Sequence, residues 1–259
     1  MKFVLTLFFM SFVSSHKSYA EIEMLSLSSD RIIIIDDELR SFIANNHCYD
    51  KGTLGAKETY ITFDIKRIDR SSSQQLPKHI GSLLNLQKLF FTGAGLKKIP
   101  ESIGYLQELT HLDLSNNNLE NLPASFIFLE NLIYLNLENN KFTIFPEYLE
   151  NFRNLKKLEY LNIGNDSVYL PGFNNNKIHS LPEWINKFSN LFYLNISGTN
   201  ITTLPTTFSK LSNLQVLCIQ GTPFEKTKTK TLNLPDQLKA ATYIPEFGCL
   251  RTKKALPSL

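Results

Sequence analysis

The sequence predicts an α/β solenoid, in which short parallel strands stack into one curved sheet and short helical or irregular segments form the opposite side. Three observations lead to this prediction. Apolar-proline pairs recur, and successive prolines from Pro77 to Pro205 are separated by 23, 23, 23, 36 and 23 residues. Aliphatic residues precede these prolines in one repeated frame. The composition, 42% hydrophobic and 20% charged over 259 residues, also allows a sizeable buried core.

Each repeat contains the frame LxxLxL, which predicts a short strand with its aliphatic side chains facing inward. In "LTHLDLSNNNLENLP" (Leu109 to Pro123) this frame is followed by a turn that contains Asn117. We expect this asparagine to hydrogen-bond backbone groups that the bend leaves unpaired. The Leu-Pro pair and the residues after it form the outer arc. One such turn cannot bury its own leucines, whereas stacked turns share a core.

This frame closely resembles the leucine-rich repeat family in its 23-residue form, LxxLxLxxNxLxxLP, over about Leu76 to Thr222. The resemblance implies a right-handed solenoid with a concave parallel β-sheet and a convex side of 3-10 helices, short helices or irregular segments. It also implies a cap at each end, because the terminal turns would otherwise expose core leucines. The chain is similar in particular to small secreted leucine-rich-repeat proteins of bacteria.

The repeats depart from the pattern in two places. The spacing of 36 residues gives the fourth repeat 13 extra residues, of which about three lengthen the arc and ten lie in an insertion at about 164–175. The frame resumes at Asn176. Elsewhere, the turn asparagine is replaced by Ala94, Thr199 and Thr222. We therefore expect fewer turn hydrogen bonds at both ends of the solenoid.

The first twenty residues have the pattern of a secretory signal peptide. Lys2 precedes an apolar run, and small residues end the segment at Ala20, where cleavage is expected. The run is too short for a membrane anchor, and no later stretch is long and apolar enough to cross a bilayer. A buried N-terminal helix is the alternative interpretation of 1–20.

The regions that flank the repeats are predicted caps. Residues 21–75 form the N-terminal cap, with a strand in "RIIII", a short helix in "DDELRSFIANN" and a degenerate first repeat whose frame is Tyr60, Phe63 and Ile65. Residues 76–222 hold the repeats. Residues 223–259 form the C-terminal cap and tail, in which "LPDQL" imitates the Leu-Pro arc.

The three cysteines, Cys48, Cys218 and Cys249, allow one disulfide in an exported protein. A bond between Cys218 and Cys249 would join the last repeat to the tail, but the sequence does not choose among the three pairs. Three isolated thiols are the alternative.

The sequence predicts neither catalysis nor a cofactor. Its five histidines show no paired metal-ligand spacing, no CxxC or GxSxG occurs, and the glycine-rich stretches fit loops better than phosphate sites. We therefore predict no catalytic residues, no metal ligands and no enzyme activity. The formal charge of +3, without a long basic stripe, does not favour nucleic-acid binding.

The candidate binding residues lie on the face of the sheet that points away from the core. Stacking of the repeats aligns equivalent residues into columns about 4.8 Å apart. The third-position column is Lys88, His111, Tyr134, Tyr160, Tyr193 and Val216, and the fifth-position column is Phe90, Asp113, Asn136, Asn162, Asn195 and Cys218. Glu138 lies beside them, and Tyr169 and Phe173 of the insertion would form a wall. Tyrosine is enriched at protein interfaces, although these side chains would also suit an exposed strand on which they pack among themselves.

These features predict an exported, non-enzymatic module that binds a partner protein through its concave sheet. Its final location would be secreted, periplasmic or surface-associated, and the family resemblance suggests contact with a host or another cell. One alternative is a structural or envelope-associated protein whose repeats self-associate. A carbohydrate binder that uses the aromatic column is another alternative.

Overall fold

The fold is described from a computed structural model, which describes residues 23–28, 31–35, 59–62, 76–145, 155–165, 175–227, 233–244 and 248–252. A nine-stranded sheet runs through it in the order β10-β11-β9-β8-β7-β6-β5-β4-β3. Two further strands, β1 (Glu23–Ser28) and β2 (Arg31–Ile35), pair antiparallel in a separate sheet. The predicted strand in "RIIII" is thus confirmed. The predicted signal peptide and the helix predicted at 36–46 lie outside the described residues.

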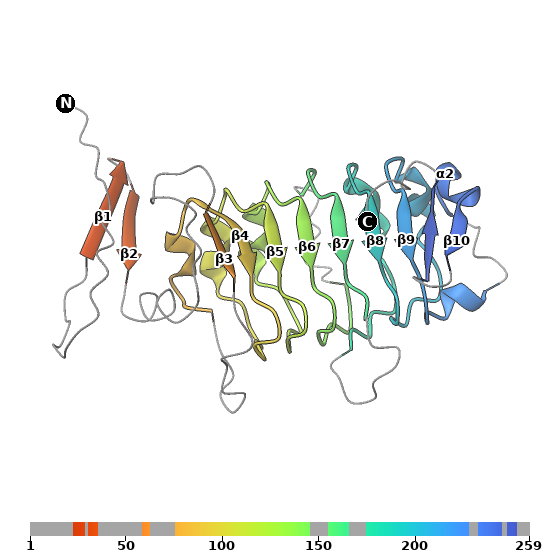
Figure 1. The fold of residues 1–259 in the computed structure, drawn as a ribbon, viewed down its shortest axis with the longest axis horizontal. Coiled ribbons are helices and arrows are strands. Elements are labelled where there is room, and N and C mark those ends of the chain that lie inside the picture. The colour runs from red at the N-terminus through yellow and green to blue at the C-terminus, as the bar shows by residue number, and fades with distance from the viewer. Residues whose placement is uncertain are drawn as a thin grey trace.

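Seven parallel strands form the main part of the nine-stranded sheet, and successive strands of the chain lie side by side in it (Figure 1). Their bounds are β3 (Thr59–Thr62), β4 (Leu86–Phe90), β5 (His111–Asp113), β6 (Tyr134–Asn136), β7 (Tyr160–Asn162), β8 (Tyr193–Asn195) and β9 (Val216–Cys218). The register pairs equivalent residues of successive repeats, as the columns predicted. Tyr160, for example, lies opposite Tyr134 on one side and Tyr193 on the other.

The first strand of this sheet has a different frame from the one that we predicted. Pairing between β3 and β4 places Ile61 opposite Leu89 and Tyr60 opposite Lys88. The frame Tyr60, Phe63 and Ile65 would have put Phe63 at the position of Leu89, so that prediction was wrong by two residues. The leucine spacing of the regular repeats is missing here, and the register shifts between Thr59 and Tyr60.

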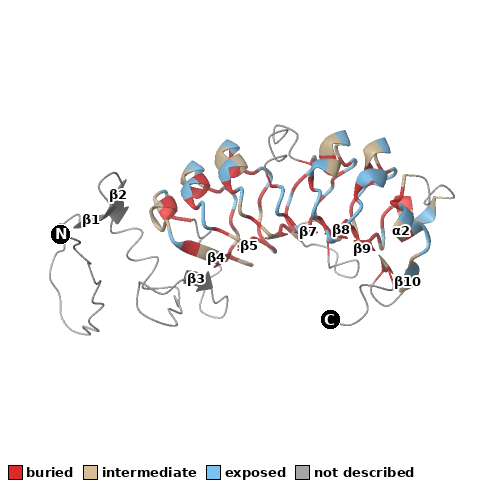
Figure 2. Ribbon diagram, turned by 90° about the horizontal axis from the view of Figure 1, so that it is seen from above, coloured by how far each residue is buried: buried red, intermediate tan, exposed pale blue. Residues whose placement is uncertain are grey.

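The outer side of the coil consists of short helical arcs that follow the prolines (Figure 2). Pro100, for example, is the N-cap residue of its arc, where its fixed φ suits the extended backbone and its carbonyl accepts a hydrogen bond from the N–H of Ile103 at 3.1 Å. Among the described residues, the arcs are η2 (Ile80–Ser82), η3 (Glu101–Tyr105), η4 (Ala124–Phe128), η6 (Glu183–Lys187), η7 (Thr206–Lys210), η8 (Phe224–Lys226) and α2 (Asp236–Lys239). In Figure 2 the strands line the inner, concave side and the arcs the outer side.

The core lies between the sheet and these arcs. Inward-facing strand residues such as Leu112 and Leu194 are fully buried, and so are arc residues such as Phe126 and Phe208. Successive arcs pack closely enough that Gly104 has no room for a side chain, since a Cβ there would lie 2.5 Å from the carbonyl oxygen of Ser125. Each repeat therefore depends on its neighbours for burial of its aliphatic residues.

A ladder of buried asparagines stabilises the turns after the strands. The side-chain oxygen of Asn117 accepts hydrogen bonds from the backbone N–H groups of Ala94 and Leu96 at 3.1 and 3.0 Å, and its amide group donates to the carbonyl of Phe91 at 2.7 Å. Asn140 and Asn176 occupy the same position in later repeats. The predicted role of the turn asparagine is thus confirmed.

Threonine fills this position less completely. The hydroxyl groups of Thr199 and Thr222 each donate one hydrogen bond within their own turn, to the carbonyls of Ile196 and Ile219, both at 2.6 Å. Neither hydroxyl reaches back to the preceding repeat as the asparagines do. The expected thinning of the ladder toward the C-terminal end is therefore present in the described residues.

The insertion leaves and rejoins the coil at two asparagines. The side-chain oxygen of Asn165 accepts a hydrogen bond from the backbone N–H of Asn176 at 2.7 Å, and its amide group donates to the carbonyls of Asn176 and Gly198. Asn176 then supplies the ladder bonds of its repeat. Ten residues can therefore be accommodated here without breaking the stack of turns. Residues 166–174 lie outside the described part of the chain.

The C-terminal end of the sheet reverses direction. Strand β11 (Cys249–Arg251) pairs antiparallel with β9, and β10 (Thr242–Ile244) pairs antiparallel with β11. A disulfide joins Cys218 of β9 to Cys249 of β11, which settles the pairing that the sequence left open. We propose that this hairpin is the main part of the predicted cap at 223–259, because it covers the edge of the last parallel strand.

Candidate interaction surface

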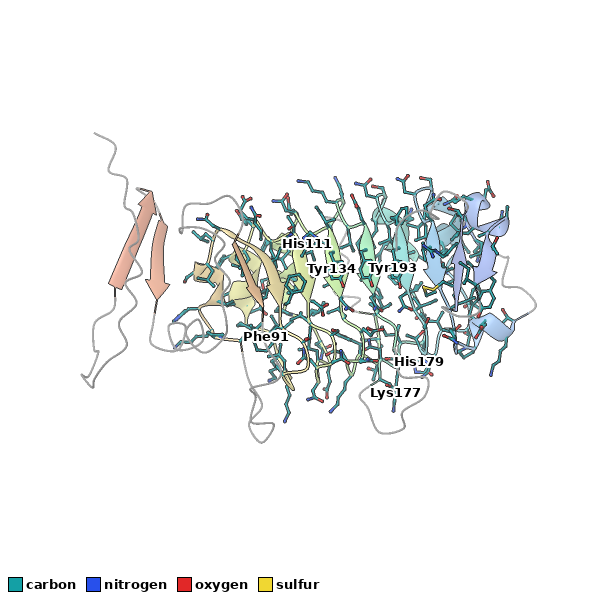
Figure 3. The ribbon with its side chains drawn as sticks, viewed as in Figure 1. Phe91, His111, Tyr134, Lys177, His179 and Tyr193 are labelled. Carbon is teal, nitrogen blue, oxygen red and sulfur yellow. A yellow bond between two sulfur atoms is a disulfide. The ribbon has the colours of Figure 1, made fainter. Side chains whose placement is uncertain are left out.

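Four aromatic side chains form a continuous stack across the concave face. The rings of Tyr134 and Tyr160 stack with their centroids 4.3 Å apart, and those of Tyr160 and Tyr193 stack at the same distance. His111 extends the stack at 5.8 Å from Tyr134. Figure 3 shows His111, Tyr134 and Tyr193 in one row over the strands. We call these four residues the aromatic ladder. It exists because the spacing of parallel strands is close to the contact distance of stacked rings.

The ladder presents ring edges rather than ring faces. Neighbouring rings are nearly parallel, with interplanar angles of 14° and 4° at the two tyrosine pairs, so each inner ring uses both faces on its neighbours. All three tyrosines remain partly exposed. A partner would therefore meet a ridge of half-buried ring edges. The register places the tyrosines in one column, as predicted, and their stacking is the mutual packing that we named as the alternative to a free binding surface.

The fifth-position column is largely buried and hydrogen-bonded within its own strands. Asn136, Asn162 and Asn195 are only 7, 4 and 9% exposed. Each accepts a hydrogen bond from the backbone N–H two residues later, at 3.1, 3.0 and 2.9 Å, and Asp113 does the same at 2.9 Å. These side chains therefore satisfy the backbone N–H groups that follow the ends of their strands. Their contribution to a partner is limited to the small area that remains exposed.

A polar link runs along the start of this column. The amide group of Asn136 donates to the Asp113 carboxylate at 3.0 Å, across neighbouring strands β5 and β6. A hydrogen bond to a charged acceptor is stronger than one between neutral groups. This hydrogen bond therefore holds the side chains of Asp113 and Asn136 in place beside Tyr134.

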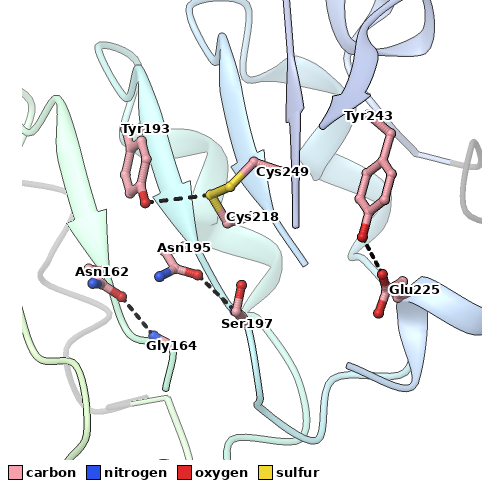
Figure 4. The surroundings of a disulfide bond; sticks show 9 residues. All are labelled: Asn162, Gly164, Tyr193, Asn195, Ser197, Cys218, Glu225, Tyr243 and Cys249. Atoms are coloured by element: carbon pink, nitrogen blue, oxygen red, sulfur yellow. Dashed lines mark hydrogen bonds between the residues drawn. A yellow bond between two sulfur atoms is a disulfide. The ribbon is translucent and has the colours of Figure 1, made fainter. Parts of the chain in front are cut away.

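The two ends of the ladder have different chemistry. At the N-terminal end, His111 lies opposite Lys88, and its Nδ1 is 2.9 Å from the hydroxyl of Thr110. At the C-terminal end, the Tyr193 hydroxyl donates to the sulfur of Cys218 at 3.5 Å (Figure 4). The disulfide thus forms the last contact of the ladder. Val216, Cys218 and Cys249 make a small buried cluster against which Tyr193 packs.

Burial keeps the ladder uncharged near neutral pH. It raises the pKa of Tyr134 to about 12, with a further contribution from the nearby Asp113 carboxylate. Burial also raises the pKa of Tyr160 and of Tyr193. At His111, burial lowers the pKa, and the charge of Lys88 lowers it further. Because a neutral hydroxyl or imidazole both donates and accepts hydrogen bonds, the ridge can contact polar groups of either kind.

The structure places the remaining predicted residues as follows. Lys88 and Phe90 lie on β4, and Glu138 lies two residues after the end of β6. All three side chains are partly exposed. Tyr169 and Phe173 lie outside the described residues, so the predicted wall stays a prediction. Sequence reasoning missed Phe192, which is 43% exposed immediately before Tyr193. The equivalent residues in the neighbouring repeats are Glu159 and Gln215, so this position does not form an aromatic column that the sequence could have shown.

Two other kinds of feature are absent from the described ranges of the chain. No group of three or more histidine, cysteine, aspartate or glutamate side chains is arranged to hold a metal ion there. No helix in the same ranges has the length and apolar character needed to cross a membrane.

Comparison with known proteins gives two family matches. The model of the leucine-rich repeat region matches residues 38–170, and the model of the single leucine-rich repeat matches residues 190–211. Among the curated proteins, nothing matches this chain.

Several solved structures are similar. A leucine-rich-repeat protein of Leptospira interrogans has 32% identity and a TM-score of 0.51, over 62% of this chain and 38% of that one. The ectodomain of the receptor kinase GASSHO1/SCHENGEN3 from Arabidopsis thaliana, in complex with Casparian strip integrity factor 2, has 24% identity and a TM-score of 0.48, over 57% and 17%. The ectodomain of the Arabidopsis thaliana receptor kinase SOBIR1 has 27% identity and a TM-score of 0.42, over 57% of this chain and 73% of that one. The chain thus spans less than half of the Leptospira protein.

Proposed function

Because the chain belongs to the leucine-rich repeat family, whose members commonly serve as non-enzymatic protein-interaction modules, we propose that it binds a partner protein through its concave face. The observation that carries this proposal is the unbroken aromatic ladder over β5 to β8. Half-buried aromatic side chains held rigidly by their neighbours lose little conformational entropy when a partner binds.

The stacking of the rings favours a protein partner over a carbohydrate. Sugars bind aromatic residues by packing against ring faces, and the inner faces of this ladder are already used by neighbouring rings. A ridge of ring edges flanked by Phe192 and by polar side chains instead fits a complementary groove or strand of another protein. We therefore expect no binding on a glycan array.

Export is the second part of the proposal. It rests on the signal-peptide pattern of residues 1–20 and on the Cys218–Cys249 disulfide, since such bonds persist mainly in oxidising compartments. N-terminal sequencing of the protein recovered from the medium, periplasm or cell surface tests this. We expect the mature chain to begin at Glu21. A chain retained in the cytoplasm with residues 1–20 intact would contradict export.

The binding proposal is tested by affinity capture from extracts of the natural surroundings, followed by measurement of Kd with the purified captured protein. Removal of the middle ring by Tyr160→Ala should weaken binding at least tenfold, as expected for an aromatic residue at the centre of an interface. Tyr105, which is 66% exposed on the convex arc η3, offers the matched control, and Tyr105→Ala should leave Kd unchanged. Equal effects of the two variants would contradict the proposal.

A further inference from the structure

Strand β9 differs from the other strands of the regular repeats. Its residues Val216 and Cys218 occupy concave positions but are only 3 and 2% exposed, and Leu217 between them faces the core. Strands β5 to β8 carry histidine, tyrosine, aspartate or asparagine at those concave positions. Strand β9 is thus apolar on both faces. Such a strand at a sheet edge would offer unpaired backbone groups together with apolar surface, which favours pairing with another chain.

The C-terminal hairpin covers this edge. The backbone N–H of Ile219 donates to the carbonyl of Gly248 at 2.9 Å, and that of Thr252 donates to the carbonyl of Gln215 at 3.0 Å. The new outer edge, β10, is three residues long and carries the exposed Thr242 and Tyr243. Very short edge strands resist pairing. The hairpin therefore covers an edge strand that favours pairing with another chain and leaves one that favours it less.

The hairpin is held to the sheet by the backbone pairing of β11 with β9, by the disulfide and by few core contacts. Cys218 and Cys249 lie directly opposite each other in the β9–β11 register. Leu250 packs against the core but stays partly exposed, and the Tyr243 hydroxyl bonds to the Glu225 carboxylate (Figure 4). The disulfide closes a loop with a sequence separation of 31, so its loss allows the hairpin many more open conformations.

We propose that the Cys218–Cys249 disulfide latches a hairpin over a self-pairing edge, and that opening of the bond lets β9 pair with β9 of a second copy. The hairpin strand that now occupies the edge runs antiparallel to β9. Two copies related by a twofold axis would pair their β9 strands in the same antiparallel sense. A second copy would therefore supply a strand of the same direction as the one that the hairpin supplies now.

The chemistry of opening is a thiol–disulfide exchange. A dithiol reductant transfers two electrons and two protons to the bond, which yields the Cys218 and Cys249 thiols and leaves the reductant as its own disulfide. Both sulfurs belong to buried residues, so reduction is verified by the mass of alkylated thiols under native conditions. A Cys218→Ser/Cys249→Ser variant gives the same open state without reductant.

The first measurement is hydrogen exchange at the Ile219 amide. In the oxidised chain this amide is bonded to Gly248. We expect its exchange to become on the order of a hundredfold faster in the double serine variant and in the reduced chain, while Leu135 in β6 stays protected as evidence that the repeats remain folded. Unchanged protection of Ile219 would overturn the latch.

The second measurement is sedimentation over a range of concentrations. The oxidised chain should stay monomeric, whereas the double serine variant should show a monomer–dimer equilibrium. Adding Val216→Lys to the double variant places a charge on the exposed edge and should restore the monomer, whereas adding Tyr105→Lys on the convex side should not. A monomer despite fast exchange at Ile219, or a dimer insensitive to Val216→Lys, would overturn pairing through β9.

Discussion

The rings of Tyr160 and Tyr193 stack nearly parallel, with their centroids 4.3 Å apart and an interplanar angle of 4°, although 33 residues separate them in the sequence. The register of β7 and β8 brings them together. Each turn of the coil thus contributes one ring to a ladder that no single repeat could form. The concave face is therefore a collective property of the stack, and changes in one ring should affect its neighbours.

Stability should depend on the ring of Tyr160 and much less on its hydroxyl. Tyr160→Ala removes two aromatic contacts worth roughly 0.5–1.5 kcal/mol each and some buried apolar area, so we expect a loss of about 2–3 kcal/mol in the free energy of unfolding. Tyr160→Phe keeps both contacts and should cost less than about 1 kcal/mol. Urea unfolding measures both. Similar losses for the two variants would show that the stack contributes little.

The buried asparagine ladder should contribute more to stability than surface asparagines. The side chain of Asn140 accepts a bond from the N–H of Leu119 at 3.0 Å and donates to the carbonyls of Leu114 and Leu137. Asn140→Ala leaves these buried groups unpaired, so we expect a loss of about 3–5 kcal/mol. Asn131, whose exposed amide group donates to Gln107, is the matched site, and Asn131→Ala should cost about 1 kcal/mol or less. Equal costs in chemical unfolding would refute the assigned role.

The disulfide should stabilise the oxidised chain mainly by restricting its unfolded state. For a separation of 31 residues, loss of the bond in Cys218→Ser/Cys249→Ser should lower the free energy of unfolding by roughly 3–4 kcal/mol. Cys48→Ser is the control, because it removes a thiol and leaves the pair intact. A change below about 1 kcal/mol in the double variant under non-reducing conditions would argue against this contribution.

His111 should make stability depend on pH in the mildly acidic range. Burial, with the charge of Lys88, lowers the pKa of His111 in the folded chain below the ordinary value of 6.5. The unfolded chain therefore takes up its proton first as the pH falls, which favours unfolding from about pH 6.5 down to the lowered folded pKa. His111→Gln should remove this component of the pH dependence. Wild-type and variant unfolding curves that stay parallel between pH 7.5 and 5 would contradict it.

The sequence predicted the repeats well because one physical constraint dominates them. Burial requires leucine at fixed positions of every turn, so the frame at Leu109, Leu112 and Leu114 alone predicts a strand, its inward face and its outward columns. The same logic failed at β3, where the leucine spacing is lost and the register sets Ile61 opposite Leu89. The Cys218–Cys249 pairing also required the structure, since it depends on a hairpin that no repeat pattern specifies.

The candidate site was predicted in position but not in form. Column arithmetic aligned Tyr134, Tyr160 and Tyr193 correctly, because register follows from the leucine frame. It left the packing of the rings on one another as an alternative, and it did not reveal that Asn162 accepts a hydrogen bond from the N–H of Gly164, since side-chain conformation depends on local contacts. The sequence likewise did not predict that the side chain of Phe192 is exposed, because this position carries a different kind of residue in each neighbouring repeat.

The central claim, that the concave face is the binding surface, is tested most directly by a hydrogen-exchange footprint of the chain with its captured partner. We predict slower exchange in peptides that cover β5 to β8 and the ladder, and unchanged exchange in the convex arcs η3, η4 and η6. Protection confined to the convex arcs, with the strands β5 to β8 unaffected by a saturating partner, would contradict the account.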